Sequence, residues 1–437
     1  MDTPICDFVR KYAESSTLRL HMPGHKGAGP LGIEHLDITE ISGADSLYEA
    51  DGIIARSEAN ASQLFGCPTF YSTEGSSQCI RAMVYLAMLQ AKAQGKPLRI
   101  AAGRNAHKTF LSAVAMMDAD VVWLYPKAGE SYLSCTVTAA DVALLTDVTA
   151  LYLTSPDYLG NMADIAAISE ICRKKGILLL VDDAHGAYLR FLQPSLHPMD
   201  LGADICCDSA HKTLPVLTGG AYLHIRDAQL AAQAKDALAI FGSTSPSYLI
   251  LQSLDAANRY LAEGYGQMLA EFIYRLADTK NRLHASGYCF AGNEPMKLNI
   301  HAKARGYTGT ELAASLRQQG VECEFSDPDY LVLMPTPALD AEGLRRLEEA
   351  LRQIPQKAPL ADCPPTFSRP EQVCTIRQAL FSPAETVPVE NSLGRVLSAA
   401  TVGCPPAVPI LICGERIDEN AIACFQYYGI THCRVCK

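Results

Sequence analysis

The segment Ala203-Asp204-Ile205-Cys206-Cys207-Asp208-Ser209-Ala210-His211-Lys212 decides the fold of this chain. Its apolar first half predicts a buried strand, and its polar second half predicts a loop at the end of that strand. Similar short apolar runs lie at residues 177–182 and 221–225, and a helical pattern over 163–175 stops at Gly176. Apolar strands that alternate with helices indicate a mostly parallel sheet covered on both faces. We therefore expect an α/β protein.

The same pattern divides the chain into four predicted parts. An N-terminal arm rich in Gly, Pro and His covers residues 1–60, and a large α/β domain covers 61–285, with further strands at 69–73, 99–102, 121–124 and 150–153. A smaller α/β domain follows at 286–360, with strands at 297–300 and 330–333 and helices at 308–320 and 340–354. Thr308 or Thr310 is expected to cap the first of these helices. A Pro-rich linker at 355–370 precedes a small C-terminal α+β domain at 371–437.

The composition is that of a soluble globular protein. Hydrophobic residues make up 49% of the 437 residues, charged residues 19%, and the formal net charge is -10. This charge, without a Lys/Arg-rich block, argues against a nucleic-acid partner and is compatible with a cationic substrate. We find no signal peptide and no uninterrupted apolar stretch of about eighteen residues, so no membrane partner and a cytoplasmic location are expected.

The sixteen cysteines are expected to be reduced, because they are scattered through apolar segments of a long chain without a secretion signal. Cys433-Arg434-Val435-Cys436 alone has the spacing of a metal or redox pair. A zinc site needs further ligands, and no second pair of this spacing is present. We expect no metal.

Lys212 lies between two predicted buried strands, where an ammonium is costly unless it is neutralised or used. A lysine whose charged end reaches solvent at a strand end is one explanation. The other is a Schiff base with an aldehyde cofactor, which removes the charge and supplies a reactive carbon. Ser209 and His211 beside it would suit a phosphate and an aromatic ring.

Three other loops also follow predicted strands, where open α/β sheets bind ligands. Glu74-Gly75-Ser76-Ser77 opens a helix, so it predicts an anion site or simply an N-cap. Arg104-Asn105-Ala106-His107 could place a ring over a flat cofactor or form a solvated polar loop. Asp182-Asp183 ends a buried strand, where one carboxylate could pair with a protonated pyridine nitrogen or bind Mg²⁺. No nucleotide-binding G-x-x-x-x-G-K-[ST] supports the magnesium alternative.

These four loops occur in the order expected of an enzyme that uses pyridoxal phosphate (PLP). The chain also resembles the Orn/Lys/Arg decarboxylase family in its short form, over nearly its whole length. The motifs that carry this resemblance are His21-Met22-Pro23-Gly24-His25-Lys26-Gly27, Asp37-Ile38-Thr39-Glu40, Arg104-Asn105-Ala106-His107-Lys108, Asp182-Asp183-Ala184-His185-Gly186, Ser209-Ala210-His211-Lys212-Thr213-Leu214-Pro215 and Pro405-Pro406-Ala407-Val408-Pro409 with Gly414-Glu415.

The resemblance implies PLP fold type I (the aspartate-aminotransferase fold), PLP as cofactor and a homodimer or higher assembly. It implies that Lys212 forms the Schiff base, that Asp182 pairs with the pyridine nitrogen and that His107 stacks on the ring. Lys212 or His211 would return a proton to Cα. Other residues at the cofactor would be Gly75, Ser76, Ser77, Ala184, His185, Ser209 and His211.

The expected reaction is decarboxylation of lysine, arginine or ornithine to its amine, as in polyamine biosynthesis. Another fold-type-I reaction (aminotransferase or lyase) and a PLP-holding regulatory relative are the alternatives. The distal cation of the substrate needs an acid, and we expect it from the N-terminal arm or from Glu415, although either could be an ordinary surface charge.

The chain departs from the family's motifs at five positions. Glu74 stands where Asn is frequent, and its carboxylate would repel a phosphate unless it points away. Asp183 replaces Glu, Ala210 replaces Thr, Gly219 replaces Gln, and Ala407 replaces Gly. None of these positions is the lysine, the pyridine acid or the stacking histidine.

Overall fold

The computed structural model describes residues 1–127, 129–366, 369–400 and 406–437. The chain forms two compact units. Unit 1 comprises Met1–Gln94 and Leu178–Met268, and unit 2 comprises Gly95–Ile177 and Leu269–Lys437. The four predicted domain boundaries remain predictions.

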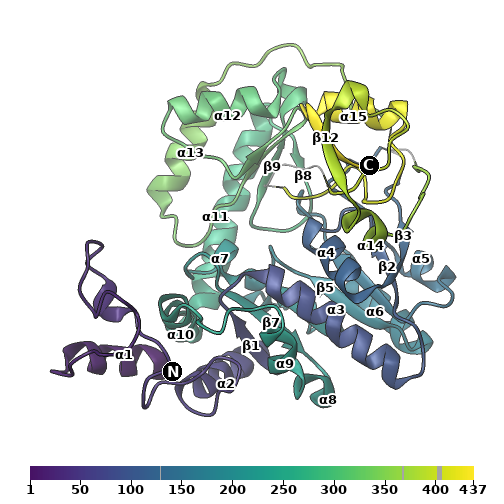
Figure 1. Cartoon of the computed structure of the whole chain (residues 1–437). Coiled ribbons are helices and arrows are strands. Elements are labelled where there is room, and N and C mark those ends of the chain that lie inside the picture. The colour runs from purple at the N-terminus through teal and green to yellow at the C-terminus, as the bar shows by residue number, and fades with distance from the viewer. Residues whose placement is uncertain (128, 367–368, 401–405) are drawn as a thin grey trace. The chain divides into compact units, whose positions relative to one another are not determined.

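Unit 1 contains four strands, in the spatial order β1-β7-β6-β5. Figure 1 labels three of them, β1, β7 and β5. These strands are β1 (Thr69–Ser72), β5 (Leu178–Asp182), β6 (Ile205–Asp208) and β7 (Ala221–Ile225). β5 and β6 are parallel, whereas β7 is antiparallel to both β6 and β1. β1, β5 and β6 therefore run in one direction, and their carboxyl ends lie at the same edge.

The helix that follows β1 has an apolar face because buried residues recur at Cys79, Met83 and Leu86. This helix, α3 (Ser76–Ala93), contacts all four strands of unit 1. The other helices of unit 1 are α1 (Pro4–Glu14), η1 (Glu34–Leu36), α2 (Ile53–Phe65), η2 (Ala187–Phe191), α7 (Ala210–Thr213), α8 (Ala228–Ala231), α9 (Ala234–Ala239) and α10 (Tyr248–Ala262).

The N-terminal arm begins with helix α1, which was not among the elements predicted from the sequence. The backbone N–H groups of Ile5 and Cys6 donate to Asp255 Oδ2, at 3.0 and 2.9 Å. Ser57 Oγ donates to the other oxygen of Asp255, at 2.6 Å. A carboxylate of α10 thus satisfies the first N–H groups of α1, which no local sequence signal reveals.

The strands that the structure describes in unit 2 fall into three groups. β2 (Arg99–Gly103), β3 (Asp120–Leu124) and β4 (Ala150–Thr154) are parallel in the order β4-β2-β3. An antiparallel sheet has the order β10-β11-β9-β8, comprising β8 (Phe290–Ala291), β9 (Leu298–His301), β10 (Phe325–Ser326) and β11 (Tyr330–Leu333). β12 (Ala384–Pro388) pairs with β13 (His432–Cys436).

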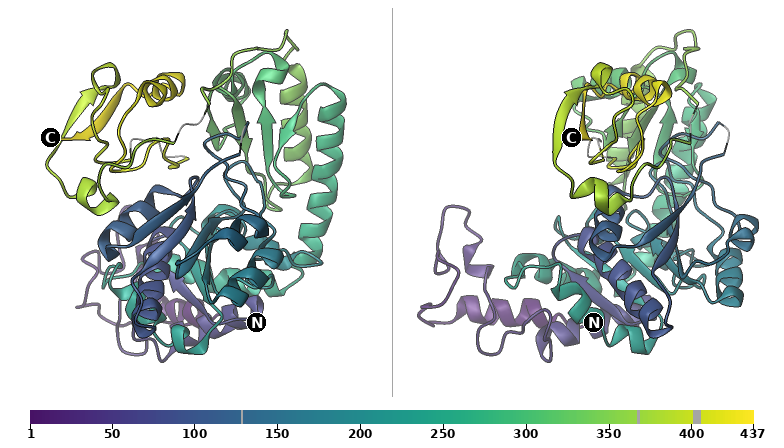
Figure 2. Two further views of the ribbon diagram at one scale, coloured as in Figure 1. Left: turned by 90° about the vertical axis from the view of Figure 1, so that its right-hand side faces the viewer. Right: turned by 45° about the vertical axis from the view of Figure 1, so that its right-hand side comes forward.

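Helices α12 (Gly309–Gln318) and α13 (Ala341–Gln353) cover one face of the four-stranded sheet, where Figure 2 shows them in green. Thr308 caps α12 in a capping box with Glu311, which confirms one of the two predicted caps. The other helices are α4 (Lys108–Met117), α5 (Ala139–Leu144), α6 (Ile165–Lys175), η3 (Ala302–Arg305), α14 (Ile376–Leu380), η4 (Val389–Asn391) and α15 (Glu419–Tyr427). α11 (Tyr265–Ala285) spans the boundary between the units.

These elements confirm the prediction of an α/β protein with mostly parallel strands in the large domain. All nine predicted strands are present, with bounds shifted by at most a residue or two. The two-residue strands β8 and β10 and the antiparallel pair β12–β13 were not predicted. Among the described residues, no helix is both long and apolar enough to cross a membrane.

The spacing of Cys433 and Cys436 does not form a two-thiol site on this backbone. Both residues lie on β13, where side chains three positions apart point to opposite faces. Cys433 is buried, whereas the Cys436 thiol accepts a hydrogen bond from Ser382 Oγ at 3.2 Å.

Candidate functional site

Three of the predicted site segments lie at one edge of unit 1. Residues 74–77 follow β1, residues 182–185 end and follow β5, and residues 209–212 follow β6. Because these three strands run in one direction, the fold brings the segments to a common edge.

The first segment has the features of a phosphate site. Gly75 is the N-cap of the 18-residue helix α3 and has a φ of 69°, in the left-handed region that favours glycine. The first turn of α3 contains no acidic residue. Ser209 Oγ donates to Ser76 Oγ at 2.8 Å, so two hydroxyls from different segments meet at the positive end of the helix dipole.

Gly219 contacts the backbone of this segment. Its carbonyl accepts a hydrogen bond from Gly75 N at 2.7 Å, and its φ is +100°. A Cβ at this position would lie 2.9 Å from the carbonyl oxygen of Thr73. The glycine that replaces the family's frequent Gln is therefore required by the backbone of this chain.

Glu74 is directed toward the loop at Ser243. Its Oε1 accepts a hydrogen bond from Ser243 N at 3.4 Å. This contact gives the carboxylate a backbone donor, and its effect on a nearby phosphate remains a prediction.

Asp182 is held in a defined orientation at the end of β5. Its side chain is only 2% exposed, and its Oδ1 accepts hydrogen bonds from Ala184 N at 3.2 Å and from Cys207 Sγ at 3.8 Å. A carboxylate this deeply buried needs a cationic partner or several donors. A protonated ring nitrogen would meet that requirement.

Lys212 lies on the short helix α7, and its Nζ is 2.9 Å from His185 Nε2. His185 was predicted only as a residue near the cofactor, and its contact with the lysine was not foreseen. His211 Nδ1 lies 2.9 Å from the carbonyl oxygen of Gly220. One nitrogen of His211 is therefore engaged with the backbone.

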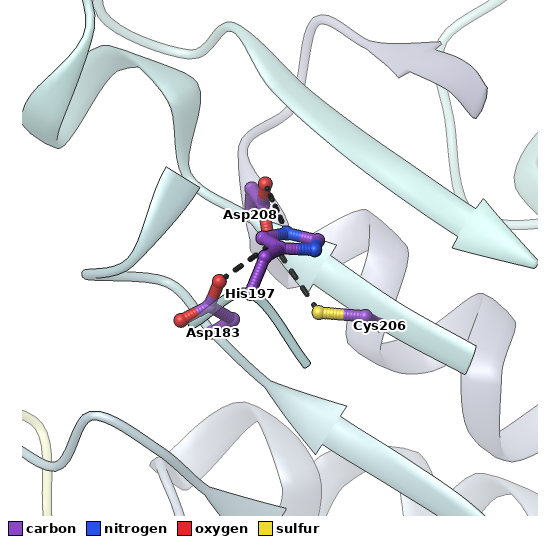
Figure 3. A group of neighbouring side chains, drawn as sticks. All are labelled: Asp183, His197, Cys206 and Asp208. Atoms are coloured by element: carbon purple, nitrogen blue, oxygen red, sulfur yellow. Dashed lines mark hydrogen bonds and ion pairs between the residues drawn. The ribbon is translucent and has the colours of Figure 1, made fainter. Parts of the chain in front are cut away.

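A buried polar cluster lies behind these segments and was missed in the sequence. It consists of Asp183, His197, Cys206 and Asp208, whose ligand-type atoms all lie within 4.8 Å of one another (Figure 3). His197 Nε2 lies 3.2 Å from Asp208 Oδ2 and 3.5 Å from Asp183 Oδ2. Asp183 and Asp208 each adjoin a predicted site residue, so this cluster connects the segments of β5 and β6.

Hydrogen bonds account for the geometry of this cluster. His224 Nε2 lies 3.0 Å from Asp208 Oδ2, and Cys206 Sγ lies 3.6 Å from Asp208 Oδ1. Burial alone would raise the pKa of Asp208. The imidazoles of His197 and His224 outweigh this effect and hold the pKa well below its usual range. A Cβ on Gly186 would lie 1.8 Å from Asp183 Oδ1, so the glycine of the D-E-A-H-G-like motif leaves room for this carboxylate.

The cluster predicts a pH dependence of stability. Burial lowers the pKa of His224 from 6.5, because the imidazolium is disfavoured inside the protein. As pH falls below about 6.5, the unfolded chain gains a proton that the folded chain resists, so the free energy of unfolding should fall by up to about 1.4 kcal/mol per pH unit. Asp208, whose pKa is depressed, adds a second loss below about pH 4.

Denaturant titrations between pH 7 and pH 5 would measure this slope. His224→Asn should reduce the slope, whatever its effect on stability at pH 7. His35→Asn, at an exposed position, is the matched control and should keep the wild-type slope. An unchanged slope in His224→Asn would contradict the assignment.

His107 belongs to unit 2, whereas the segments described above belong to unit 1. It is the N-cap of α4, where its Nδ1 accepts a hydrogen bond from Thr109 N at 3.1 Å. This bond fixes the direction of the ring relative to α4. Its predicted stacking on a cofactor remains a prediction.

Glu415 is a buried ion-pair partner, which argues against its predicted role as the substrate's acid. Its Oε2 lies 3.1 Å from an Arg104 terminal nitrogen, and both side chains are only 1% exposed. The same oxygen accepts a hydrogen bond from Ile412 N at 2.7 Å. Burial raises the pKa of Glu415, and the Arg104 guanidinium opposes that rise. The carboxylate is thus committed to holding the C-terminal segment on the loop after β2.

Ala407 occupies a backbone conformation that suits glycine. Its φ is 57°, and its carbonyl accepts a hydrogen bond from Lys108 N at 2.8 Å. Pro405 of the same motif lies outside the described residues. The glycine expected from the family resemblance would adopt this φ without the steric cost that alanine bears.

Ala407→Gly should therefore stabilise the protein. Glycine removes the steric cost of the left-handed conformation, but it also increases the conformational entropy of the unfolded chain. The net gain in the free energy of unfolding should be up to about 1 kcal/mol. A higher midpoint in denaturant unfolding would show it. Ala338→Gly, in an exposed turn without positive φ, is the control and should not stabilise. A lower midpoint for Ala407→Gly would refute the strain argument.

The residues of unit 1 fit pyridoxal phosphate in chemical type. Two contacting hydroxyls lie at a helix N-terminus, a buried carboxylate ends β5, and a primary amine follows β6. These groups match, in turn, a phosphate, a pyridine nitrogen and an aldehyde.

Known proteins with similar sequences include decarboxylases of basic amino acids. The family model described as "Orn/Lys/Arg decarboxylase, major domain" matches residues 3–291. Arginine decarboxylase of Bacillus subtilis is 30% identical over 97% of this chain and 92% of its own length. Arginine decarboxylase of Halalkalibacterium halodurans is 31% identical over 96% and 92%.

Solved structures show the same fold. Lysine decarboxylase of Francisella novicida matches with a TM-score of 0.82 and 15% identity, over 100% of this chain and 81% of the other. The constitutive lysine decarboxylase of E. coli matches with a TM-score of 0.76 and 17% identity, over 100% and 82%.

Proposed function

Because the chain belongs to the Orn/Lys/Arg decarboxylase family, we propose that it is a PLP-dependent enzyme that decarboxylates arginine. Decarboxylation of a basic amino acid follows from the family, and the two relatives at 30% identity or more are both named arginine decarboxylases. The observation that carries the proposal is the edge of unit 1 at which Asp182 ends β5 and Lys212 follows the parallel strand β6.

Each residue at this edge has one proposed task. Lys212 holds the cofactor covalently through its amine. Ser76, Ser77 and Ser209, with the N-terminus of α3, bind the phosphate. Asp182, oriented by Ala184 N, carries the negative charge that keeps the ring nitrogen protonated.

When bound, the cofactor accepts the electron pair that remains after the Cα–carboxylate bond breaks. The protein must then return a proton to Cα. Lys212 is the proposed donor, because the amine that would hold the cofactor would also lie near the substrate's Cα. His185, 2.9 Å from the Lys212 amine, can exchange that proton, whereas one nitrogen of His211 is engaged with Gly220.

The test is product formation from purified enzyme supplied with arginine, lysine or ornithine. Carbon dioxide and the matching amine are measured for each, and arginine should give the highest kcat/KM. Preference for lysine or ornithine would overturn the arginine assignment but keep the reaction. Bound PLP with transamination or lyase products, or with no turnover, would instead favour the alternative PLP reactions or a regulatory role.

We also propose that the enzyme works in the cytoplasm as a homodimer or larger homo-oligomer, within polyamine biosynthesis. The N-terminal arm supports the assembly, since it exposes several large apolar side chains. Leu18, Leu20 and Leu31 are 78%, 82% and 77% exposed. Large apolar side chains exposed within one short segment of the chain are typical of protein interfaces.

Replacing both Leu18 and Leu20 with serine should weaken that assembly. Each leucine that no longer becomes buried removes about 1.5–3 kcal/mol of association free energy. Light scattering coupled to gel filtration would then show a smaller mass than the wild type at equal concentration. Leu144→Ser, at an 81% exposed position on α5, is the control and should leave the mass unchanged. A wild type that is already monomeric would contradict the proposal.

A further inference from the structure

Unit 2 contains a cavity of about 400 Å³ that the proposed reaction does not use. Its lining includes Tyr132, Phe325, Asp327, Tyr427 and Tyr428. Aromatic rings and a carboxylate around one small space are the groups that recognise organic cations.

The aromatic residues form a connected wall. The Tyr132 and Tyr428 ring centroids are 4.6 Å apart, and those of Tyr427 and Tyr428 are 4.9 Å apart. The hydroxyl of Tyr427 donates to Asp329 Oδ1 at 2.7 Å, which fixes that side chain. Aromatic rings held in place beside a cavity can attract a cation at little entropic cost.

Asp327 supplies a negative charge at this wall. Its side chain is 7% exposed, and its Oδ1 accepts hydrogen bonds from the backbone N–H groups of Asp329 and Tyr330, at 2.8 and 2.7 Å. Within the described part of the chain, no hydrogen-bond donor reaches its buried Oδ2. A buried carboxylate oxygen without a donor is costly, so a cation in the cavity that Asp327 lines would offset part of that cost through its charge.

The neighbouring acid already has its cation. Lys303 Nζ lies 2.9 Å from Asp329 Oδ1, and the same ammonium lies 4.8 Å from the centre of the Tyr427 ring. Lys303, Asp329 and Tyr427 thus combine a cation, a carboxylate and an aromatic ring. The cavity offers a carboxylate and aromatic rings of the same kind beside Asp327.

The ionisation of these groups is compatible with cation binding. Burial raises the pKa of Asp327 to about 6, so most of the carboxyl is ionised at pH 7.5. Burial, together with the charges of Asp327 and Asp329, raises the pKa of Tyr132 and of Tyr428. Both phenols therefore remain neutral at that pH.

We propose that this cavity binds a small organic cation, an alkylammonium or guanidinium ion, with Asp327 as its counter-ion and the tyrosine rings as its walls. If the proposed decarboxylation holds, the amine product of the enzyme has this chemistry and is the natural occupant. That last identification rests on the proposed function, whereas the cation site itself does not.

Isothermal titration of the full-length, PLP-loaded enzyme at pH 7.5 tests the site. The probe is methylguanidinium, which is cationic and has no primary amine for the cofactor to capture. N-methylurea has a similar shape without the charge. We expect the enzyme to bind methylguanidinium at millimolar or lower concentration and to bind N-methylurea at least tenfold more weakly.

Two variants locate the binding. Asp327→Asn keeps the size of the side chain and should weaken methylguanidinium at least tenfold, and Tyr428→Leu should do the same with the carboxylate intact. Asp362→Asn, at an exposed acid that also contacts Lys303, is the matched control and should bind as the wild type does. Circular dichroism verifies that each variant is folded.

Three results would overturn the proposal: no binding of methylguanidinium to the wild type, equal binding of N-methylurea, or unchanged affinity in folded Asp327→Asn and Tyr428→Leu. The titration involves no turnover, so its failure leaves the proposed decarboxylation standing. A failure of decarboxylation would likewise leave the titration result standing.

Discussion

Lys212→Ala is expected to lower decarboxylation by at least about a thousandfold. The variant loses the amine that would both hold the cofactor and return a proton to the substrate, and loss of one such group typically costs this much or more. The visible absorbance of protein-bound PLP should fall with it. Initial rates of carbon dioxide release and absorbance after dialysis are the two measurements.

Lys174→Ala provides the control, because Lys174 is an exposed lysine on α6 whose ammonium forms a long ion pair of 4.0 Å with Glu170. It should keep the wild-type rate and absorbance. If Lys212→Ala keeps both, the assignment of Lys212 is wrong. If it keeps bound PLP in another form but loses turnover, Lys212 acts in proton return and is not needed for retention.

Glu415→Gln is expected to reduce the free energy of unfolding by about 3–5 kcal/mol. The change leaves the Arg104 guanidinium buried without its counter-charge, and removing one partner of a buried ion pair costs about that much. Denaturant titration of the wild type and the variant measures the loss. An effect confined to KM, with unchanged stability, would instead restore the role in substrate binding predicted from the sequence.

A double-mutant cycle with Arg104→Met isolates the pair. Each single variant leaves one buried charge uncompensated, whereas the double variant removes both charges. The double variant should therefore recover most of the loss seen in Glu415→Gln. Additive losses would mean that the two side chains contribute independently, through packing alone.

The sequence predicted the strands of the large domain because their signal is local. Short apolar runs such as β5 and β7 stand out against the helices around them, and both are fully buried. The polar segments after these strands were predicted for the same reason, since a lysine or a carboxylate at a buried strand end needs a physical explanation.

The features that the sequence did not predict depend on residues far apart in the chain. The cluster around His197 contains Asp183, which directly follows β5, Cys206 and Asp208 of β6, and His224 of β7. The partner of Glu415 is 311 positions away, at Arg104. Helix α1 is capped from Asp255, some 250 positions away. No window of sequence contains both members of such a pair, so a motif such as Gly414-Glu415 suggested a site where the structure has a buried ion pair.

The buried cluster has a consequence for how the site opens. Asp183 directly follows Asp182, and Asp208 directly precedes Ser209, so the two segments that carry the proposed catalytic groups are joined through one imidazole. Moving either segment alone would leave a buried carboxylate, Asp183 or Asp208, without its contact to His197. Amide hydrogens of residues 182–185 and 209–212 should therefore exchange with solvent together, in one cooperative opening, and the distance between carboxylate and lysine is maintained for as long as unit 1 remains folded.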